Sequence, residues 1–300
     1  MKKLLLICTL LISCSTFADL QKGLDSVSKE DFSSAFDEFN VLAAQGDAVA
    51  QSILGVMYKN GQGTAQDYKA AVAWYTKAAE QGNANAQFNL GLMYYEGQGT
   101  AQDNKVAFYW YTKAAEQGIA WAQYNLGNLY RKGEGTDRDY EAAIRWHTKA
   151  AEQGIANAQF NLALMYEGGK GTAQDYKVAI EWFTKAAEQD YADSQYYLAL
   201  MYEEGRGTTQ DYQASINWYK KAARQGYLSA QTNLGYMYVM GQGTVQDNVK
   251  AHMWWNIAAN NGHANALKNR DKIQSYMTPA DISKAKDLTQ ECVTQEYTNC

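Results

Sequence analysis

The sequence predicts an all-α solenoid of about six repeats, each with two helices, and with capping helices at both ends. The stretch "GQGTAQDYKAAVAWYTKAAEQG", which begins at Gly61, returns every 36 residues in a varied form. Its later copies begin at Gly97, Gly133, Gly169, Gly205 and Gly241. Small and apolar residues recur at helical spacing in both halves of each copy. A fixed period of this length is typical of a solenoid.

Each repeat contains two expected helices, the first over about 85–96 and the second over about 68–81 in their respective copies. In each repeat an aspartate directly precedes the second of the two helices: Asp67, Asp103, Asp139, Asp175, Asp211 and Asp247. We expect these aspartates to be N-caps, because a carboxylate there accepts a backbone N–H and meets the positive end of the helix dipole.

The second helix of each repeat has a stripe of aromatic residues along one face. Trp74 and Tyr75 share a face with Ala71 and Ala78, and the tryptophan recurs at Trp110, Trp146, Trp182, Trp218 and Trp254. Because the stripe recurs in every repeat, it favours helix packing over a ligand-binding box.

The glycines also follow the repeat, since all but Gly23 and Gly168 of the 24 occupy repeat positions. They are expected in the loop, after the second helix and in the middle of the first helix, where a left-handed backbone or a close approach favours glycine. The G-x-G-T loop lacks the spacing and the preceding strand of a phosphate-binding loop, so it is expected to be a turn. Asp190, Ala163 and Ala199 replace repeat glycines, which could shift the packing of the fourth and fifth repeats.

The pattern A-x-A-Q-x-N-L-G-x-M-Y-x-x-G-x-G-x-x-x-D-x-x-x-A-x-x-W-Y-x-K-A-A-E-Q-G, from about Ser28 to Asn269, resembles the Sel-1-like repeat family, a relative of the tetratricopeptide repeat. The resemblance implies antiparallel helix pairs in a right-handed superhelix that serves as an adaptor or scaffold for other proteins. It implies no shared active site. Some cysteine-rich bacterial members have been linked to penicillin binding, but the disulfide-forming cysteines of their repeats are missing here.

The N-terminus has the layout of a secretory signal peptide, with two lysines, a short apolar run and small residues up to Ala18. Cleavage after Ala18 is slightly favoured over a lipobox at residues 11–14, which would leave a lipidated Cys14. Either route predicts a periodic solenoid outside the cytoplasm, periplasmic or secreted, and attached to the outer membrane only if Cys14 is lipidated. The expected organisation is a signal peptide at 1–18, the solenoid at 19–277 and a capping helix with its tail at 278–300.

The two ends of the array carry expected caps. Thr278 and Pro279 are placed as N-cap and first residue of a final helix. Beyond it, Cys292 and Cys300 are expected to form a disulfide in an oxidising compartment. At the other end, Ser28 with Asp31 is expected to open a lone second helix that contains Phe36 and Phe39.

The search for chemistry favours a protein that is not an enzyme, with no catalytic residues, metal or cofactor. His147, His252 and His263 lack metal-ligand spacing. The S-x-x-K matches at Ser26 and Ser283 lack the accompanying K-T-G and S-D-N motifs of penicillin-binding enzymes. The net charge is −5, or −7 after loss of Lys2 and Lys3, which predicts no nucleic-acid partner. We expect a monomer.

The preferred function is a scaffold or adaptor in the bacterial cell envelope that binds a protein or peptide. The alternatives are a β-lactam-binding or cell-wall enzyme and an exported factor that engages a host receptor. In a tetratricopeptide-like superhelix the first helices line the concave face, which predicts an aromatic ladder beside an amide ladder for an extended peptide. Trp121 adds a tryptophan that no repeat-wide packing requires. The candidate partner-binding residues are Phe88, Asn89, Trp121, Tyr124, Asn125, Phe160, Asn161, Tyr196 and Asn233.

Overall fold

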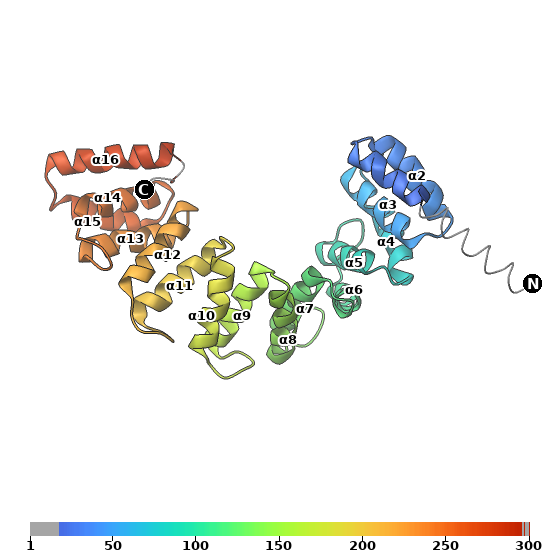
Figure 1. Ribbon diagram of the computed structural model, residues 1–300, viewed down its shortest axis with the longest axis horizontal. Helices are drawn as coiled ribbons and strands as arrows, with labels where there is room; N and C mark the ends of the chain where they lie inside the picture. The colour runs from blue at the N-terminus through green and yellow to red at the C-terminus, as the bar shows by residue number, and fades with distance from the viewer. Residues whose placement is uncertain (1–17, 296, 298–299) are drawn as a thin grey trace, which may run out of the picture. The chain divides into compact units, whose positions relative to one another are not determined.

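The computed structural model describes residues 18–295, 297 and 300, and within these residues it is all-helical, without strands. The chain divides into two compact units, residues 1–149 and 150–300. Each unit is a stack of helix pairs (Figure 1). The expected signal peptide lies outside the described residues except for Ala18, so its cleavage and the lipidation of Cys14 stay predictions.

Each repeat consists of a first helix, a glycine loop and a second helix. The first helices are α3 (Ala48–Asn60), α5 (Ala84–Glu96), α7 (Ala120–Lys132), α9 (Ala156–Gly168), α11 (Ala192–Glu204) and α13 (Leu228–Met240). The second helices are α4 (Tyr68–Glu80), α6 (Asn104–Glu116), α8 (Tyr140–Glu152), α10 (Tyr176–Ala187), α12 (Tyr212–Arg224) and α14 (Asn248–Asn260). The remaining helices are α2 (Phe32–Ala44), α15 (Ala264–Gln274) and α16 (Pro279–Thr294). The expected helices therefore match the structure to within a residue at each end.

The aspartate N-caps are confirmed. Asp67 accepts the backbone N–H groups of Lys69 and Ala70 at 2.9 and 3.0 Å, and the aspartates of the other five repeats bond in the same way. Each carboxylate satisfies a backbone donor that has no partner inside its helix. The caps fix where every second helix begins.

The glycine loop is a turn, as expected. Gly61 ends α3 in the left-handed conformation, at φ 69°. A Cβ on Gly63 would lie 2.1 Å from the carbonyl oxygen of Phe32, so only glycine fits at this approach of the loop to a neighbouring helix. The side chain of Gln66 donates to the carbonyl of Lys59 at 2.8 Å and closes the loop. All of these glycines and amides serve the turn.

The core of each repeat is built around the ring that follows the tryptophan. Tyr75 lies against Gly55, and Tyr111 lies against Gly91, where an added Cβ would be 2.8 Å from the tyrosine ring. The corresponding buried rings in the later repeats are His147, Phe183, Tyr219 and Trp255. Mid-helix glycine thus gives the ring room, as the sequence predicted.

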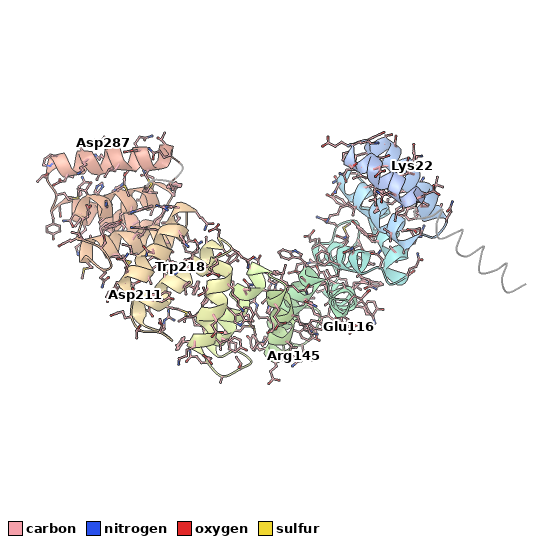
Figure 2. All side chains as sticks on the ribbon, viewed as in Figure 1. Lys22, Glu116, Arg145, Asp211, Trp218 and Asp287 are labelled. Carbon is pink, nitrogen blue, oxygen red and sulfur yellow. A yellow bond between two sulfur atoms is a disulfide. The ribbon has the colours of Figure 1, made fainter. Side chains whose placement is uncertain are left out.

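Most of the repeated tryptophans lie at the edge of this core. Trp218, labelled in Figure 2, is half-buried on α12. The ammonium of Lys221 lies 4.0 Å from the centroid of its ring. Trp74, Trp146 and Trp182 carry a lysine in the same way. Trp254 is the fully buried member of this column. The tryptophans therefore pack within the array as expected, but most of them are only partly buried.

Neighbouring repeats are joined by pairs of glutamines. Buried Gln87 on α5 donates to the carbonyl of Ala79, and its own amide oxygen accepts from Gln117 at 2.7 Å. The same chain of bonds recurs from Gln81 to Gln51, from Gln189 to Gln159 and from Gln225 to Gln195. These bonds satisfy amides that would otherwise be costly to bury.

The N-terminal end differs from the prediction of a lone helix. A helix over residues 18–28 precedes α2, and Gly23 faces the ring of Phe39, with an added Cβ 2.6 Å away. Asp31 is the N-cap of α2 and accepts from Ser34, whereas Ser28 bonds back to Asp25. Residues 18–44 therefore form a further helix pair, and Gly23 has the role of a mid-helix repeat glycine.

The C-terminal end is covered by α16. Thr278 is its N-cap and Pro279 its first residue, as expected. The helix packs on α14 through Ala285, Thr289 and Cys292, which are all buried. The Cα atoms of Cys292 and Cys300 are 5.5 Å apart, within the range of a disulfide, so the structure is compatible with the expected bond.

Candidate partner-binding surface

The expected aromatic ladder lies on the first helices, and each of its rings is half-buried. Each ring packs on the core ring of the second helix that follows. The centroid distances are 6.0 Å for Phe88–Tyr111, 5.7 Å for Tyr124–His147, 5.8 Å for Phe160–Phe183 and 5.8 Å for Tyr196–Tyr219. The ladder therefore contributes to helix packing and leaves only part of each ring for a partner.

The amide ladder lies beside these rings, and its members differ in their partners. Asn233 donates to the hydroxyl of Tyr219 at 2.8 Å, which ties α13 to α12. Asn125 lies beside Tyr111 and opposes the rise of its pKa. Asn89 is half-buried on α5, and Asn161 on α9 has a partner within the folded chain. At least Asn233 is thus used in joining two helices.

The fifth repeat has Tyr197 in place of the asparagine. Its ring stacks on Phe183, with centroids 5.5 Å apart and an interplanar angle of 17°. Phe183 has no hydroxyl for an amide to bond. The ladder residue therefore changes together with the core ring it faces.

Trp121 differs from the rest of the ladder because its side chain is 48% exposed. It lies in the first turn of α7 and contacts Tyr124 edge-on, at a centroid distance of 5.7 Å. Its sister positions hold valine, asparagine, aspartate and serine. Packing of the repeat therefore does not account for an indole at this position.

The candidate residues are divided between the two units. Phe88, Asn89, Trp121, Tyr124 and Asn125 belong to the first unit, and Phe160, Asn161, Tyr196 and Asn233 to the second. In each unit they lie on the first helices, so each unit has its own part of the first-helix face. We use this term for the surface of α3, α5 and α7 in one unit and of α9, α11 and α13 in the other.

The Sel1 repeat family matches the chain over six consecutive segments: residues 48–83, 84–119, 122–155, 156–191, 192–227 and 228–263. Each segment covers one first helix and the second helix that follows it, except that the third segment begins at the third residue of α7. The chain belongs to the Sel1 repeat family.

Solved Sel1-repeat structures are similar to the chain over most of its length. A Sel1 repeat protein from Oxalobacter formigenes is 33% identical over 80% of this chain and 96% of its own, with a TM-score of 0.70. The protective antigen c5321 of uropathogenic Escherichia coli, described as having an SLR fold, is 26% identical over 94% of this chain and 85% of its own, with a TM-score of 0.54. No curated protein sequence matches the chain. Sel1-repeat proteins are generally non-enzymatic scaffolds for protein interactions.

One set of side chains on the first-helix face was missed by the sequence analysis. These side chains stand two residues before the first glycine of each loop. They are Lys59, Tyr95 and Arg131 in the first unit, and Glu167, Glu203 and Val239 in the second. The position has no repeat-wide residue type, so the search for shared columns passed over it. Its variation was the available signal, because a site that distinguishes one repeat from another must use residues that differ.

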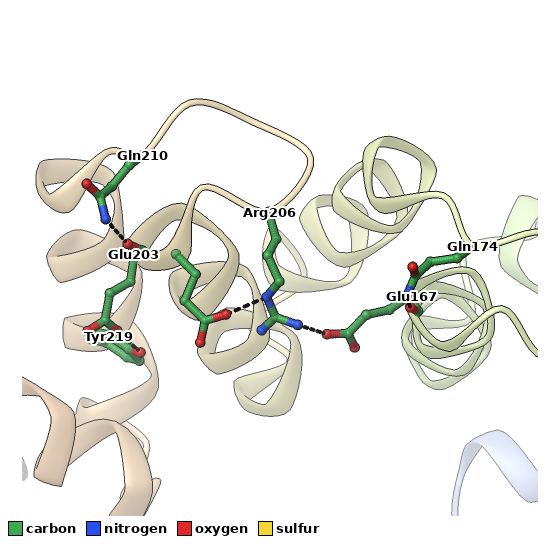
Figure 3. A network of polar contacts seen from close by, with 7 residues as sticks. Glu167, Gln174, Glu203, Arg206, Gln210 and Tyr219 are labelled. Atoms are coloured by element: carbon green, nitrogen blue, oxygen red, sulfur yellow. Dashed lines mark hydrogen bonds and ion pairs between the residues drawn. The ribbon is translucent and has the colours of Figure 1, made fainter.

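In the second unit these carboxylates are paired. Glu167 pairs with Arg206, as Figure 3 shows, at a nitrogen–oxygen distance of 2.5 Å. Arg206 also pairs with Glu204 at 2.6 Å. Figure 3 also shows Glu203, whose carboxylate accepts the hydroxyl of buried Tyr219 at 2.6 Å. Burial raises the pKa of Tyr219, and the nearby Glu203 carboxylate raises it further. The hydroxyl is therefore a fully engaged donor.

In the first unit the corresponding core groups lack such partners. Among the described residues, the hydroxyl of Tyr75 and both ring nitrogens of His147 are buried without a hydrogen-bond partner, and the hydroxyl of Tyr111, with Asn125 beside it, has no acceptor. Burial lowers the pKa of His147 to about 3, with a smaller contribution from Arg131, so the ring is neutral near pH 7. The core rings beneath the first-helix face of the first unit thus lack the carboxylate partner that Tyr219 has in the second unit.

An apolar pocket of about 380 Å³ lies at the C-terminal end of the second unit. It lies between α13, α14 and α15 and includes exposed Met240 and Tyr276. Asn269 donates to the hydroxyl of Tyr236 at its edge, at 2.6 Å. This pocket was also missed, because its residues come from the last, divergent repeat.

The described residues hold no group of three or more His, Cys, Asp or Glu side chains placed to bind a metal ion. Within the same residues, no helix is both long and apolar enough to cross a bilayer. Ser26 of the S-x-x-K match donates to the carboxylate of Glu38 at 3.2 Å. This contact favours a structural role for Ser26 over activation by a lysine.

Proposed function

We propose that this Sel1-repeat protein is exported to the bacterial envelope and there binds an extended segment of a partner protein along the first-helix face of its first unit. The observation that carries the proposal is the half-exposed indole of Trp121 beside Tyr124. A rigid aromatic side chain that no packing requirement explains is typical of an interaction hot spot. The general role of the family as a protein-interaction scaffold supports the same reading.

The partial exposure of the ladder rings fits this function. A half-buried ring is already ordered by its contact with the core, so a bound peptide gains contact area with little loss of side-chain entropy. Amide side chains on the same face can bond to the N–H and C=O groups of an extended backbone. A peptide can thus be recognised by its shape and main chain, with specificity added by individual positions.

The test is photocrosslinking in intact cells. A photoreactive phenylalanine replaces Trp121 in one variant and Tyr109 in the other. Tyr109 is a matched control because it is aromatic, belongs to the same unit and is 51% exposed, but lies on second helix α6. We expect a discrete adduct from position 121 and none from position 109, and mass spectrometry identifies the captured protein. Equal adducts from both positions, or none from position 121, would refute the proposed surface.

The envelope location has a separate test. Export with cleavage after Ala18 predicts a periplasmic or secreted protein whose first residue is Asp19, whereas lipidation predicts a membrane-bound protein that begins at Cys14. Cell fractionation and the intact mass of the mature protein distinguish the two. Full-length protein in the cytoplasm contradicts both.

A further inference from the structure

Tyr111 is one of the residues that line a small pocket in the first unit. The pocket has a volume of about 170 Å³ and is lined by Tyr95, Tyr111, Asn125, Asn128, Leu129 and Lys132. Tyr111 is only 1% exposed, and its hydroxyl has Asn125 beside it but no acceptor within hydrogen-bond distance. A buried donor without an acceptor destabilises the folded chain, so a group that fills the pocket and accepts this bond is favoured.

The equivalent place in the second unit shows which group fits. Tyr219 corresponds to Tyr111 and Asn233 to Asn125, each 108 residues further along the chain. There the carboxylate of Glu203 accepts the tyrosine hydroxyl at 2.6 Å, and Asn233 donates to the same hydroxyl at 2.8 Å. The residue of the first unit that corresponds to Glu203 is Tyr95. The first unit therefore keeps the donor but lacks the carboxylate.

The side chain of Tyr95 does not replace the missing carboxylate. Its hydroxyl bonds instead to Glu134 at 3.2 Å, and Lys132 lies 3.4 Å from the same hydroxyl. Lys132 also pairs with Glu134 at 3.5 Å and is 41% exposed, so its ammonium can turn toward an incoming anion. Asn125 and Asn128 contribute amide groups to the same lining.

The charges around the pocket are mixed. Arg131 and Lys132 on α7 are cationic, whereas Glu134 in the loop and Glu96 at the end of α5 are anionic. The pocket therefore does not attract anions by net charge. A carboxylate in the pocket would accept hydrogen bonds from Tyr111 and Lys132, and such bonds are stronger with an ionised acceptor than with a neutral one.

We propose that this pocket binds the carboxylate of an aspartate or glutamate side chain of the partner segment, in the place that Glu203 fills in the second unit. The volume of the pocket is several times the roughly 30 Å³ that one water occupies, which suits a carboxylate and its methylene stem. The proposal rests on the proposed function for the identity of the ligand as part of a protein, but the pocket itself can be tested alone. The first unit is then the part of the protein that recognises an acidic side chain of the partner.

The test uses N-acetyl-glutamate methylamide as a probe and the isosteric N-acetyl-glutamine methylamide as its uncharged match. Both are titrated into the full mature chain, and the side-chain amide signals of Asn125 and Asn128 are followed by NMR. We expect saturable shifts with the glutamate probe that are absent or at least about tenfold weaker with the glutamine probe. The signal of Asn233 serves as an internal control, since Glu203 already fills its site, and should not respond.

Two variants check the assignment. Tyr111→Phe removes the donor but keeps the ring, as Phe183 does in a sister repeat, and should weaken the glutamate probe about tenfold. Tyr95→Glu supplies the carboxylate from within and should abolish binding of the probe while raising the melting temperature. Circular dichroism of both variants verifies the fold.

The inference is overturned if the wild-type chain does not respond, if the two probes act equally, or if Tyr111→Phe binds as the wild type does. Crosslinking from position 121 together with any of these results leaves the proposed function standing and removes only the acidic ligand. Probe binding without crosslinking keeps the pocket and removes the extended surface. The two failures are therefore distinguishable.

Discussion

His147 occupies the core position that a tyrosine, phenylalanine or tryptophan fills in the other repeats. Its ring is fully buried between Gly127 and Tyr124, and both nitrogens lack partners. A protonated ring would be costly there, because neither the surroundings nor the nearby Arg131 stabilises a positive charge. The His147 ring therefore fills this core position by its shape, and its polar nitrogens contribute no hydrogen bond.

We predict that His147→Phe makes the protein less sensitive to acid. The pKa of His147 falls from 6.5 to about 3 on folding, so below pH 6.5 only the unfolded state takes up the proton and stability falls until about pH 3. The loss at pH 4.5 is about 2–3 kcal/mol. Urea unfolding at pH 7.5 and pH 4.5 should show a smaller difference for the variant, with a remainder from His252, whose pKa is also lowered. Parallel pH profiles of the two proteins would contradict this account.

Asp190 is the second residue that departs from its sisters. It has φ 59°, in the left-handed region where Gly82, Gly118, Gly154 and Gly226 stand in other repeats. A side chain in this conformation costs on the order of 1 kcal/mol relative to glycine. The turn itself is thus the same, as the sequence comparison assumed.

Asp190→Gly should therefore raise the melting temperature, with a gain of up to about 1 kcal/mol in the free energy of unfolding. The variant loses the 3.3 Å bond from Gln195 to the aspartate, but Gln195 keeps its bond to the carbonyl of Ala187. Differential scanning calorimetry provides the measurement. A clear fall in melting temperature would mean that the Gln195 contact outweighs the backbone strain.

At the scale of the helices, the contact between mid-helix glycine and core ring sets the spacing of each pair. Ala163 and Ala199 lie in the same core clusters as Phe183 and Tyr219, so two repeats accept one extra methyl group at this contact. In the repeats that have glycine at this position, the core ring occupies the space that a Cβ would need. The spacing is therefore adapted repeat by repeat.

Gly91→Ala should destabilise the protein by about 1–3 kcal/mol, because the new Cβ would lie 2.8 Å from the ring of buried Tyr111. Gly168→Ala is the matched control at a helical glycine where the nearest atom would be 3.8 Å away. It should be neutral or stabilising by up to about 1 kcal/mol. Chemical denaturation of both variants tests the contact, and equal effects would show that helix propensity alone is being measured.

The terminal helix offers another element-scale prediction. Mass spectrometry of non-reduced protein isolated from an oxidising compartment should join Cys292 to Cys300. Because the closed loop is short, Cys300→Ser should lower the free energy of unfolding by about 2 kcal/mol at most. Two free thiols in that material would exclude the bond.

At the scale of the whole molecule, the sequence predicted the fold well because the features that build the repeats recur. The aspartate caps and the loop glycines each act within one repeat, so their columns reveal their roles. The N-terminal helix pair was missed because its shorter loop places Gly23 only 16 residues before Phe39, whereas Gly55 precedes Tyr75 by 20. A search at a fixed 36-residue period does not find a helix pair with a different spacing.

The candidate surface was less predictable for the opposite reason. A sequence column cannot show whether Asn233 faces a partner or the hydroxyl of Tyr219, since both roles use the same amide. It also cannot show that Tyr111 lacks the carboxylate that Tyr219 has, because this depends on where the side chains of Tyr95 and Glu203 point. The functional differences between repeats therefore become visible only with their contacts.

The central claim is that the first-helix face, with Trp121, binds the partner, and the most direct measurement is the Kd of the crosslinked partner for wild-type, Trp121→Ala and Tyr109→Ala proteins by calorimetry. We expect Trp121→Ala to keep its circular dichroism spectrum and to lose about 2 kcal/mol of binding free energy, roughly a thirtyfold rise in Kd. Tyr109→Ala should bind as the wild type does. An unchanged Kd for Trp121→Ala, or an equal loss in both variants, would contradict the account.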